Sequence, residues 1–221
     1  SHNDHNGNHA YFQASHQTKI ILRDVEAAIV SDFSLMKAAY FPATAWELER
    51  EMPHLLLKAD QTFTEETREI AIDSAKFSLI PLPGHTPGHT GIVTPDDVLY
   101  VGDTLLSHTV LQKAKLPSTL DWIKDMESKR RLLSEYHSRY ILAHEGVYTE
   151  ITTIIEENLT DKVQRAVQPR DFLSKRDVWN LSEIEQLLWK QWGLHGKSFL
   201  TRTTFQRNVY CALEYLIAEG M

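Results

Sequence analysis

The sequence contains 221 residues, of which 42% are hydrophobic and 24% charged, and its formal net charge is -7 at pH 7. This is the composition of a globular protein, and the length suits one large domain or one domain with a small appendage. The acidic charge argues against nucleic acid as a partner, because binders of polyanions usually carry a basic face. The densest basic run, residues 129–131, is explained by a solvated helix face.

The single cysteine, Cys211, excludes an intrachain disulfide and a zinc cluster of thiolates. This cysteine usage favours a reducing, cytoplasmic location. No segment reaches the roughly 18 apolar residues of a membrane-spanning helix, so we expect no membrane partner.

The first sixty residues predict mainly helix. A short helix is expected within residues 6–15, a buried strand over 18–24, and two or three helical pieces between 24 and 58, interrupted by Pro42 and Pro53.

The middle of the chain is rich in β-branched residues and alternating patterns. Strands are predicted within residues 67–73, 75–83, 91–103 (two strands around a Pro-Asp-Asp turn) and 139–146. A helix capped by Ser118 and Asp121 is expected before the last of these.

After about residue 158 only helical patterns remain, one of them with Ser182 and Glu185 at capping-box spacing. We therefore expect an α/β catalytic domain over residues 1–157 and a helical C-terminal region over 158–221 that could resemble a winged helix.

Four short motifs carry histidine or aspartate directly after predicted strands or at the start of the chain. They are HNDH at 2–5, PGHTPGHT at 83–90, VGDT at 101–104 and LAHEG at 142–146. A parallel or mixed sheet would bring such strand ends to one edge. Imidazole and carboxylate groups suit zinc, iron or manganese, and a carboxylate can bridge two cations, so the motifs indicate a dinuclear site.

These motifs resemble those of the metallo-β-lactamase-fold hydrolases, of which glyoxalase II is a familiar member. The end of the family motif H-x-H-x-D-H matches His2, Asp4 and His5, and the later motifs match His89, Asp103 and His144. The order and approximate spacing agree over residues 1 to about 157, but the resemblance does not cover the tail.

The resemblance implies a four-layer αββα sandwich with two divalent metal ions, zinc or alternatively iron or manganese. In that assignment His2 and His89 bind the first metal, while Asp4, His5 and His144 bind the second, and Asp103 bridges the two. His85 falls at a position where we expect a supporting role without metal ligation. His108 is a candidate substrate contact.

One departure concerns the family's first histidine, which would fall one position before Ser1. The strands that usually precede the motif are also absent. We therefore expect an N-terminally incomplete catalytic domain that is completed by a missing N-terminal segment or by a second chain. A homodimer is a further expectation.

The leading hypothesis is a hydrolase that uses a metal-bound hydroxide to cleave a small ester, thioester or lactone. Asp103 would orient the hydroxide, and Asp4 could relay a proton to the leaving group. Two alternatives remain open: a phosphodiesterase or ribonuclease of the same fold, and a non-catalytic binding protein that has lost a metal ligand.

Overall fold

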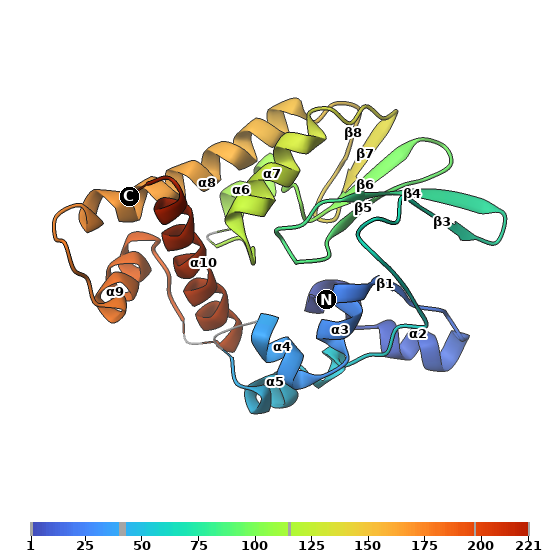
Figure 1. Cartoon of the computed structure of the whole chain (residues 1–221), viewed down its shortest axis with the longest axis horizontal. Coiled ribbons are helices and arrows are strands. Elements are labelled where there is room, and N and C mark those ends of the chain that lie inside the picture. The colour runs from blue at the N-terminus through green and yellow to red at the C-terminus, as the bar shows by residue number, and fades with distance from the viewer. Residues whose placement is uncertain (1, 40–42, 115, 197, 221) are drawn as a thin grey trace.

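The largest sheet of the protein has six strands of mixed direction and lies at one side of the molecule, at the upper right of Figure 1. The computed structural model describes residues 2–39, 43–114, 116–196 and 198–220. The strands lie side by side in chain order: β3 (Glu69–Ile72), β4 (Ala75–Pro81), β5 (Thr90–Val93), β6 (Val98–Gly102), β7 (Arg139–Leu142) and β8 (Val147–Tyr148). Neighbouring strands are antiparallel except for β6 and β7, which are parallel.

These directions place three strand ends at one edge of the sheet. Because β5 is antiparallel to both β4 and β6, those two strands run the same way, and β7 runs with them. The segments that follow β4, β6 and β7 therefore leave the sheet at a common edge. Polar side chains gather readily at such an edge, because loops are free to present them.

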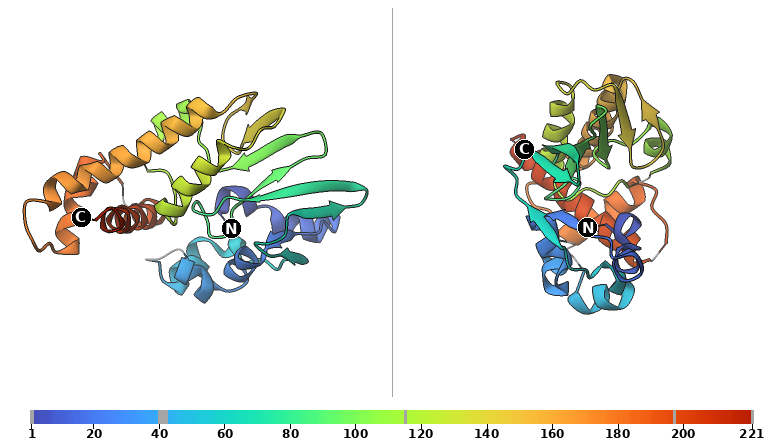
Figure 2. Two further views of the ribbon diagram at one scale, coloured as in Figure 1. Left: turned by 45° about the horizontal axis from the view of Figure 1, so that its top comes forward. Right: turned by 90° about the vertical axis from the view of Figure 1, so that its right-hand side faces the viewer.

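Two helices, α7 (Trp122–Leu132) and α8 (Thr152–Leu173), cover one face of the sheet (Figures 1 and 2). The apolar cluster beneath them joins inward-facing strand residues to the start of α8. Leu99 and Val101 of β6 are fully buried there, together with Ile155 of α8. Alternate residues of β6 thus point into the core, as the period of a strand requires.

The C-terminal helices form a second apolar cluster. Helices α9 (Leu181–Gln191) and α10 (Phe199–Ala218) pack against each other, and α10 also contacts α7 and α8. Leu188, Val209 and Ala212 are fully buried there, and Trp122 joins the cluster from α7. The expected domain boundary between residues 157 and 158 falls inside α8, which is one continuous helix contributing to both clusters.

The N-terminal part packs around a third cluster, which includes Val30, Met36 and Leu48. Its elements are α1 (Asn3–Asn6), α2 (His9–His16), β1 (Ile21–Arg23), α3 (Asp24–Val30), α4 (Phe33–Ala39), α5 (Ala45–Glu51), the 3-10 helix η1 (Pro53–Leu55) and β2 (Gln61–Phe63). β1 and β2 form a small parallel pair of their own. A further short helix, α6 (His108–Lys113), lies between β6 and α7.

The structure confirms an α/β fold with a helical C-terminal region. The described residues contain the six-stranded sheet and the β1–β2 pair, and the second large sheet of an αββα sandwich is not seen among them. No helix in the described ranges combines the length and apolar character needed to cross a lipid bilayer.

Both predicted capping pairs differ in detail from the structure. Asp121 caps α7, and its side chain accepts from the backbone N–H of Lys124. The capping box of α9 is formed by Asn180 and Glu183 in place of Ser182 and Glu185. Asn180 has the extended backbone of an N-cap, whereas Ser182 already lies in the first helical turn.

Replacing Leu99 by alanine tests the importance of the sheet cluster. Leu99 is fully buried, so Leu99→Ala should lower the free energy of unfolding by about 2–5 kcal/mol through lost burial and a residual cavity. The matched control is Leu133→Ala, at a side chain 42% exposed, which should cost less than about 1 kcal/mol. Urea denaturation followed by circular dichroism measures both, and equal losses would contradict this account of the core.

Candidate metal centre

The common edge of the sheet presents two histidines and an aspartate. His85 lies in the loop after β4, Asp103 directly follows β6, and His144 lies two residues after β7. Each position is set by the end of a strand. The side chains converge because the three strands run in the same direction.

The N-terminal turn supplies the remaining members. The short helix α1 contains Asp4 and His5 and directly follows His2. Its turn is closed by the backbone N–H groups of His5 and Asn6, which donate to the carbonyl of His2. This turn lies against the sheet edge, where His5 Nε2 is 2.7 Å from Asp103 Oδ2.

The polar groups form two clusters of three. His2, His85 and Asp103 make up the first cluster, and Asp4, His5 and His144 the second; in each, the candidate ligand atoms lie within 4.8 Å of one another. Within the first cluster, His85 Nε2 is 2.8 Å from His2 Nδ1 and 3.2 Å from Asp103 Oδ2.

Asp103 also contacts the second cluster. Its Oδ1 is 3.3 Å from His144 Nε2, and its Oδ2 contacts His5 as described above. His144 Nε2 lies 3.2 Å from Asp4 Oδ2, which closes the second cluster. One carboxylate is therefore shared by the two clusters, and both of its oxygens lie near imidazole nitrogens.

The electrostatics of Asp103 fit a cation site. Burial by itself raises the pKa of this carboxyl, but the hydrogen bond and charge of His85, with the charges of His5 and His144, outweigh burial and hold the pKa well below its usual range. Oδ1 is buried without a hydrogen-bond partner among the described residues. An ionised carboxylate with an unsatisfied buried oxygen, surrounded by imidazole nitrogens, is the donor set that divalent metals prefer.

The structure places the two histidines of the PGHTPGHT motif differently from what the sequence led us to expect. His85, expected to be a support, lies in the first cluster, whereas His89, expected to bind the first metal, does not. Both ring nitrogens of His89 are engaged elsewhere: Nε2 accepts from the backbone N–H of Asp103 at 3.2 Å, and Nδ1 lies 3.2 Å from Thr104 Oγ1. His89 therefore orients the residue that the two clusters share.

His89 remains neutral in this position, because burial lowers its pKa to about 3. Its ring packs against Gly102, where a β-carbon would lie 2.6 Å from His89 Nε2, and Gly102 adopts a left-handed φ of 58°. Glycine is thus required at the end of β6 both for the backbone turn and for the space that His89 occupies.

The structure does not bring His108, the candidate substrate contact, to either cluster. It begins α6, where its Nδ1 lies 3.1 Å from Glu157 Oε1 and its Nε2 lies 2.8 Å from Gln112 Nε2. Its side chain is 63% exposed.

A cavity of about 510 Å³ opens from the two clusters into the protein. Its walls come from α5, η1, α6, α7, α8 and α10 as well as from the clusters themselves. Lys129 lines the cavity and is only 3% exposed, so the basic run at 129–131, expected on a solvated face, is solvated only in part. The sequence pattern alone could not show that Lys129 is buried while Arg130 and Arg131 are exposed.

Comparisons with known proteins agree with this fold. A model of the Metallo-beta-lactamase superfamily matches residues 1–144, and the chain belongs to that superfamily, whose members are mostly metal-dependent hydrolases. A curated relative, Glyoxylase B2 of Dictyostelium discoideum, is 25% identical over 173 residues. That match covers 75% of this chain and 58% of the relative, so the chain spans little more than half the length of that protein.

Two solved structures have the same fold over almost the whole chain. A metallo-beta-lactamase family protein of Thermus thermophilus is 19% identical with a TM-score of 0.65, and the match covers 98% of this chain and 71% of that one. A beta-lactamase domain protein of Burkholderia ambifaria is 14% identical with a TM-score of 0.67, covering 98% and 67%. The fold similarity includes the C-terminal helices, which the family model does not reach.

The role of Gly102 can be tested against a second glycine of similar backbone conformation. Gly102→Ala should displace His89 and lower the affinity for zinc by about tenfold or more, because supporting groups of a metal site typically contribute that much. Gly193→Ala is the control, since Gly193 has a φ of 59° but nothing within 4 Å of a new β-carbon. Competition with a chromogenic chelator measures the affinity, and equal affinities in the two variants would contradict this role.

Proposed function

We propose that the protein is a metal-dependent hydrolase that cleaves a small ester, thioester or lactone. The observation that carries the proposal is the position of Asp103, whose carboxylate contacts both His/Asp clusters. Membership of the superfamily supports it, and so does the similarity to a relative named a glyoxylase.

The two clusters would hold two divalent cations, with Asp103 shared between them. His2 and His85 would complete one site, and Asp4, His5 and His144 the other. Imidazole and carboxylate donors suit zinc, and also iron or manganese. Bound cations of this kind lower the pKa of a water molecule and stabilise the negative charge that develops on a carbonyl oxygen.

The chain's own residues would orient the reactants and move the proton. Asp103 stays ionised because the neighbouring histidines hold its pKa low, so it remains an acceptor throughout. Asp4 has a side chain 55% exposed and lines the cavity, where it can take up a proton and pass it to a leaving group. His89 fixes the backbone of Asp103 and takes no direct part.

The cavity favours a substrate with an apolar portion. Leu106, Val110 and Leu120 line it from the segments that follow β6, and Leu48 and Leu200 line it from the N- and C-terminal parts. Such walls exclude water and bury an acyl chain. We further propose that the six-stranded sheet is one of the two sheets of an αββα sandwich, as in the superfamily.

Removal of single donors tests the shared carboxylate. Asp103→Ala should abolish hydrolysis of a thioester, a fall of about a thousandfold or more, because both cations lose a ligand. His85→Ala should reduce bound metal from about two equivalents to about one. His108→Ala should change neither quantity. Metal content is measured by plasma mass spectrometry after gel filtration, and undiminished metal in Asp103→Ala would contradict the assignment.

Chelation and a substrate panel test the reaction class. Treatment with EDTA should abolish hydrolysis, and zinc or manganese should restore it. The panel contains a thioester, a lactone and a generic phosphodiester, and we expect turnover of one or both of the first two. Turnover of the phosphodiester alone would favour a nuclease, and absence of both tightly held metal and turnover would favour a binding protein.

A further inference from the structure

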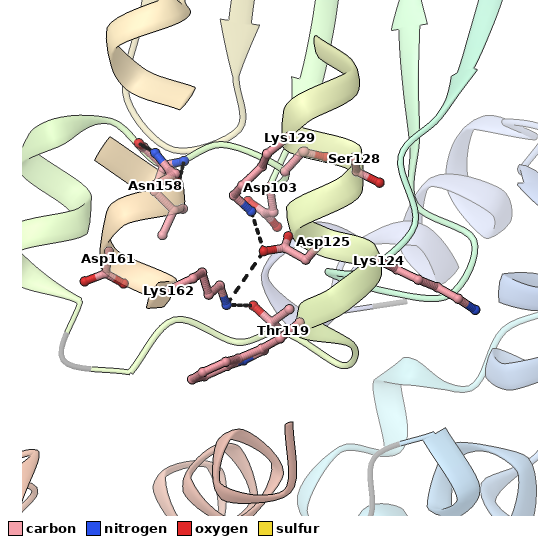
Figure 3. A network of polar contacts seen from close by, with 12 residues as sticks. Asp103, Thr119, Lys124, Asp125, Ser128, Lys129, Asn158, Asp161 and Lys162 are labelled. Carbon is pink, nitrogen blue, oxygen red and sulfur yellow. Dashed lines mark hydrogen bonds and ion pairs between the residues drawn. The ribbon is translucent and has the colours of Figure 1, made fainter. Parts of the chain in front are cut away.

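The cavity beside the metal centre contains a group of buried charges that the proposed hydrolysis does not use (Figure 3). Lys129 and Asp125 come from α7, and Lys162 comes from α8. Lys129 is 3% exposed, Asp125 1% and Lys162 5%. All three line the same cavity as Asp103 and His144.

The contacts within this group are unequal. Lys129 Nζ donates to Asp125 Oδ2 at 2.5 Å, four residues earlier on the same helix. Lys162 Nζ is 3.8 Å from the same oxygen, and it donates a hydrogen bond to the hydroxyl of Thr119 at 2.6 Å. Its ammonium group also lies 4.9 Å from the centre of the Trp122 ring. Asp125 is thus matched mainly by Lys129.

Within this group of three residues the balance of charge is positive. Two ammonium groups face one carboxylate, and Asp161, the other acidic residue of this part of the cavity, is ion-paired with Arg165 at 2.7 Å. Burial lowers the pKa of Lys162 to about 8, although Asp125 opposes this, so the group is still largely protonated at neutral pH. A buried, incompletely matched ammonium costs free energy, and an anion in the cavity would recover it.

The rest of the cavity is suited to hydrocarbon. The apolar side chains that line it include Leu106, Val110, Leu111 and Leu120. A volume of about 510 Å³ is that of a site for a small organic molecule. An occupant that reaches both the metal centre and the lysines would therefore lie against these apolar side chains, with its reacting carbonyl at the metal centre and a charged end at the lysines.

We propose that the cavity binds acyl substrates whose far end carries a carboxylate, and that Lys162, oriented by Thr119, binds that carboxylate. For the reacting end of the substrate, this proposal rests on the proposed hydrolytic function. For the carboxylate end, it rests on the buried charges. A singly charged carboxylate would balance the one excess ammonium of this group. Charge-assisted hydrogen bonds of this kind are the strong ones.

Two variants of the lysines separate this role from general electrostatics. Lys162→Met removes the ammonium but keeps the apolar stem, and it leaves the Lys129–Asp125 pair intact. Lys124→Met is the matched control, because Lys124 lies on α7, has a side chain 61% exposed and points away from the network (Figure 3). Thr119→Val removes only the hydroxyl that orients Lys162, and it carries the test if Lys162→Met does not fold.

The first measurement is binding without turnover. Calorimetry on the purified, metal-loaded chain compares octanoate with octanamide, which differ in charge at one end. We expect octanoate to bind about tenfold tighter in the wild type and in Lys124→Met, and this ratio to fall to about twofold or less in Lys162→Met. A ratio near one in the wild type would overturn the proposal, since the cavity would then not recognise the carboxylate. An undiminished ratio in Lys162→Met and Thr119→Val would also overturn it, since the carboxylate would then bind elsewhere.

The second measurement is selectivity in turnover. The ratio of kcat/KM for a carboxyl-ended suberoyl thioester to that for an octanoyl thioester should exceed about ten in the wild type and in Lys124→Met, and should fall about tenfold in Lys162→Met. A parallel loss on both substrates indicates a structural role and overturns the proposal. If neither thioester is hydrolysed but octanoate binding still depends on Lys162, the hydrolytic function is wrong and the carboxylate site stands.

Discussion

The arrangement of the site depends on one buried carboxylate at the end of β6. Asp103 is only 8% exposed, and an ionised carboxylate in such a place is stable only if positive charge or donors surround it. Three histidines from three separate segments, His5, His85 and His144, meet this need. The strand directions and the turn at Gly102 can both be understood as the means of bringing them together.

The same requirement joins the N-terminal segment to the sheet. The HNDH turn is too short to be stable alone, because a single helical turn fixes several residues for very few hydrogen bonds. It is held against the sheet edge by the contacts of its own side chains with His85, Asp103 and His144. The N-terminal segment makes a further contact farther along. There, the buried Glu26 of α3 accepts from the backbone N–H of Gly88 at 2.7 Å, which fixes the loop that carries His85. The loop that carries His85 and the N-terminal segment that carries the HNDH turn therefore position each other.

The sequence was sufficient to predict the strands that carry Asp103 and His144, because VGDT and LAHEG each follow a strongly apolar run. It was also sufficient to identify the family, because the order and spacing of the four motifs agree with the family pattern. It was not sufficient to separate His85 from His89. Both follow a glycine in the same Pro-Gly repeat, and only the packing of His89 against Gly102 decides which ring faces the cavity. The prediction for Lys129 was wrong for a similar reason, since its neighbours are charged and its own burial depends on Asp125, one helical turn away.

Helix α8 packs against both the site and the C-terminal helices, and it does so along one side of the helix. Ile155, Asn158, Lys162, Ala166 and Leu173 are buried on it at spacings of three, four and seven residues, which describe one stripe. Asn158 bonds both backbone groups of Leu106, just beyond Asp103, while Ala166 and Leu173 pack among the C-terminal helices. A single inserted residue would rotate everything beyond it by about 100°. The tail can therefore diverge in composition during evolution, but the length of this helix between the sheet and the tail is constrained.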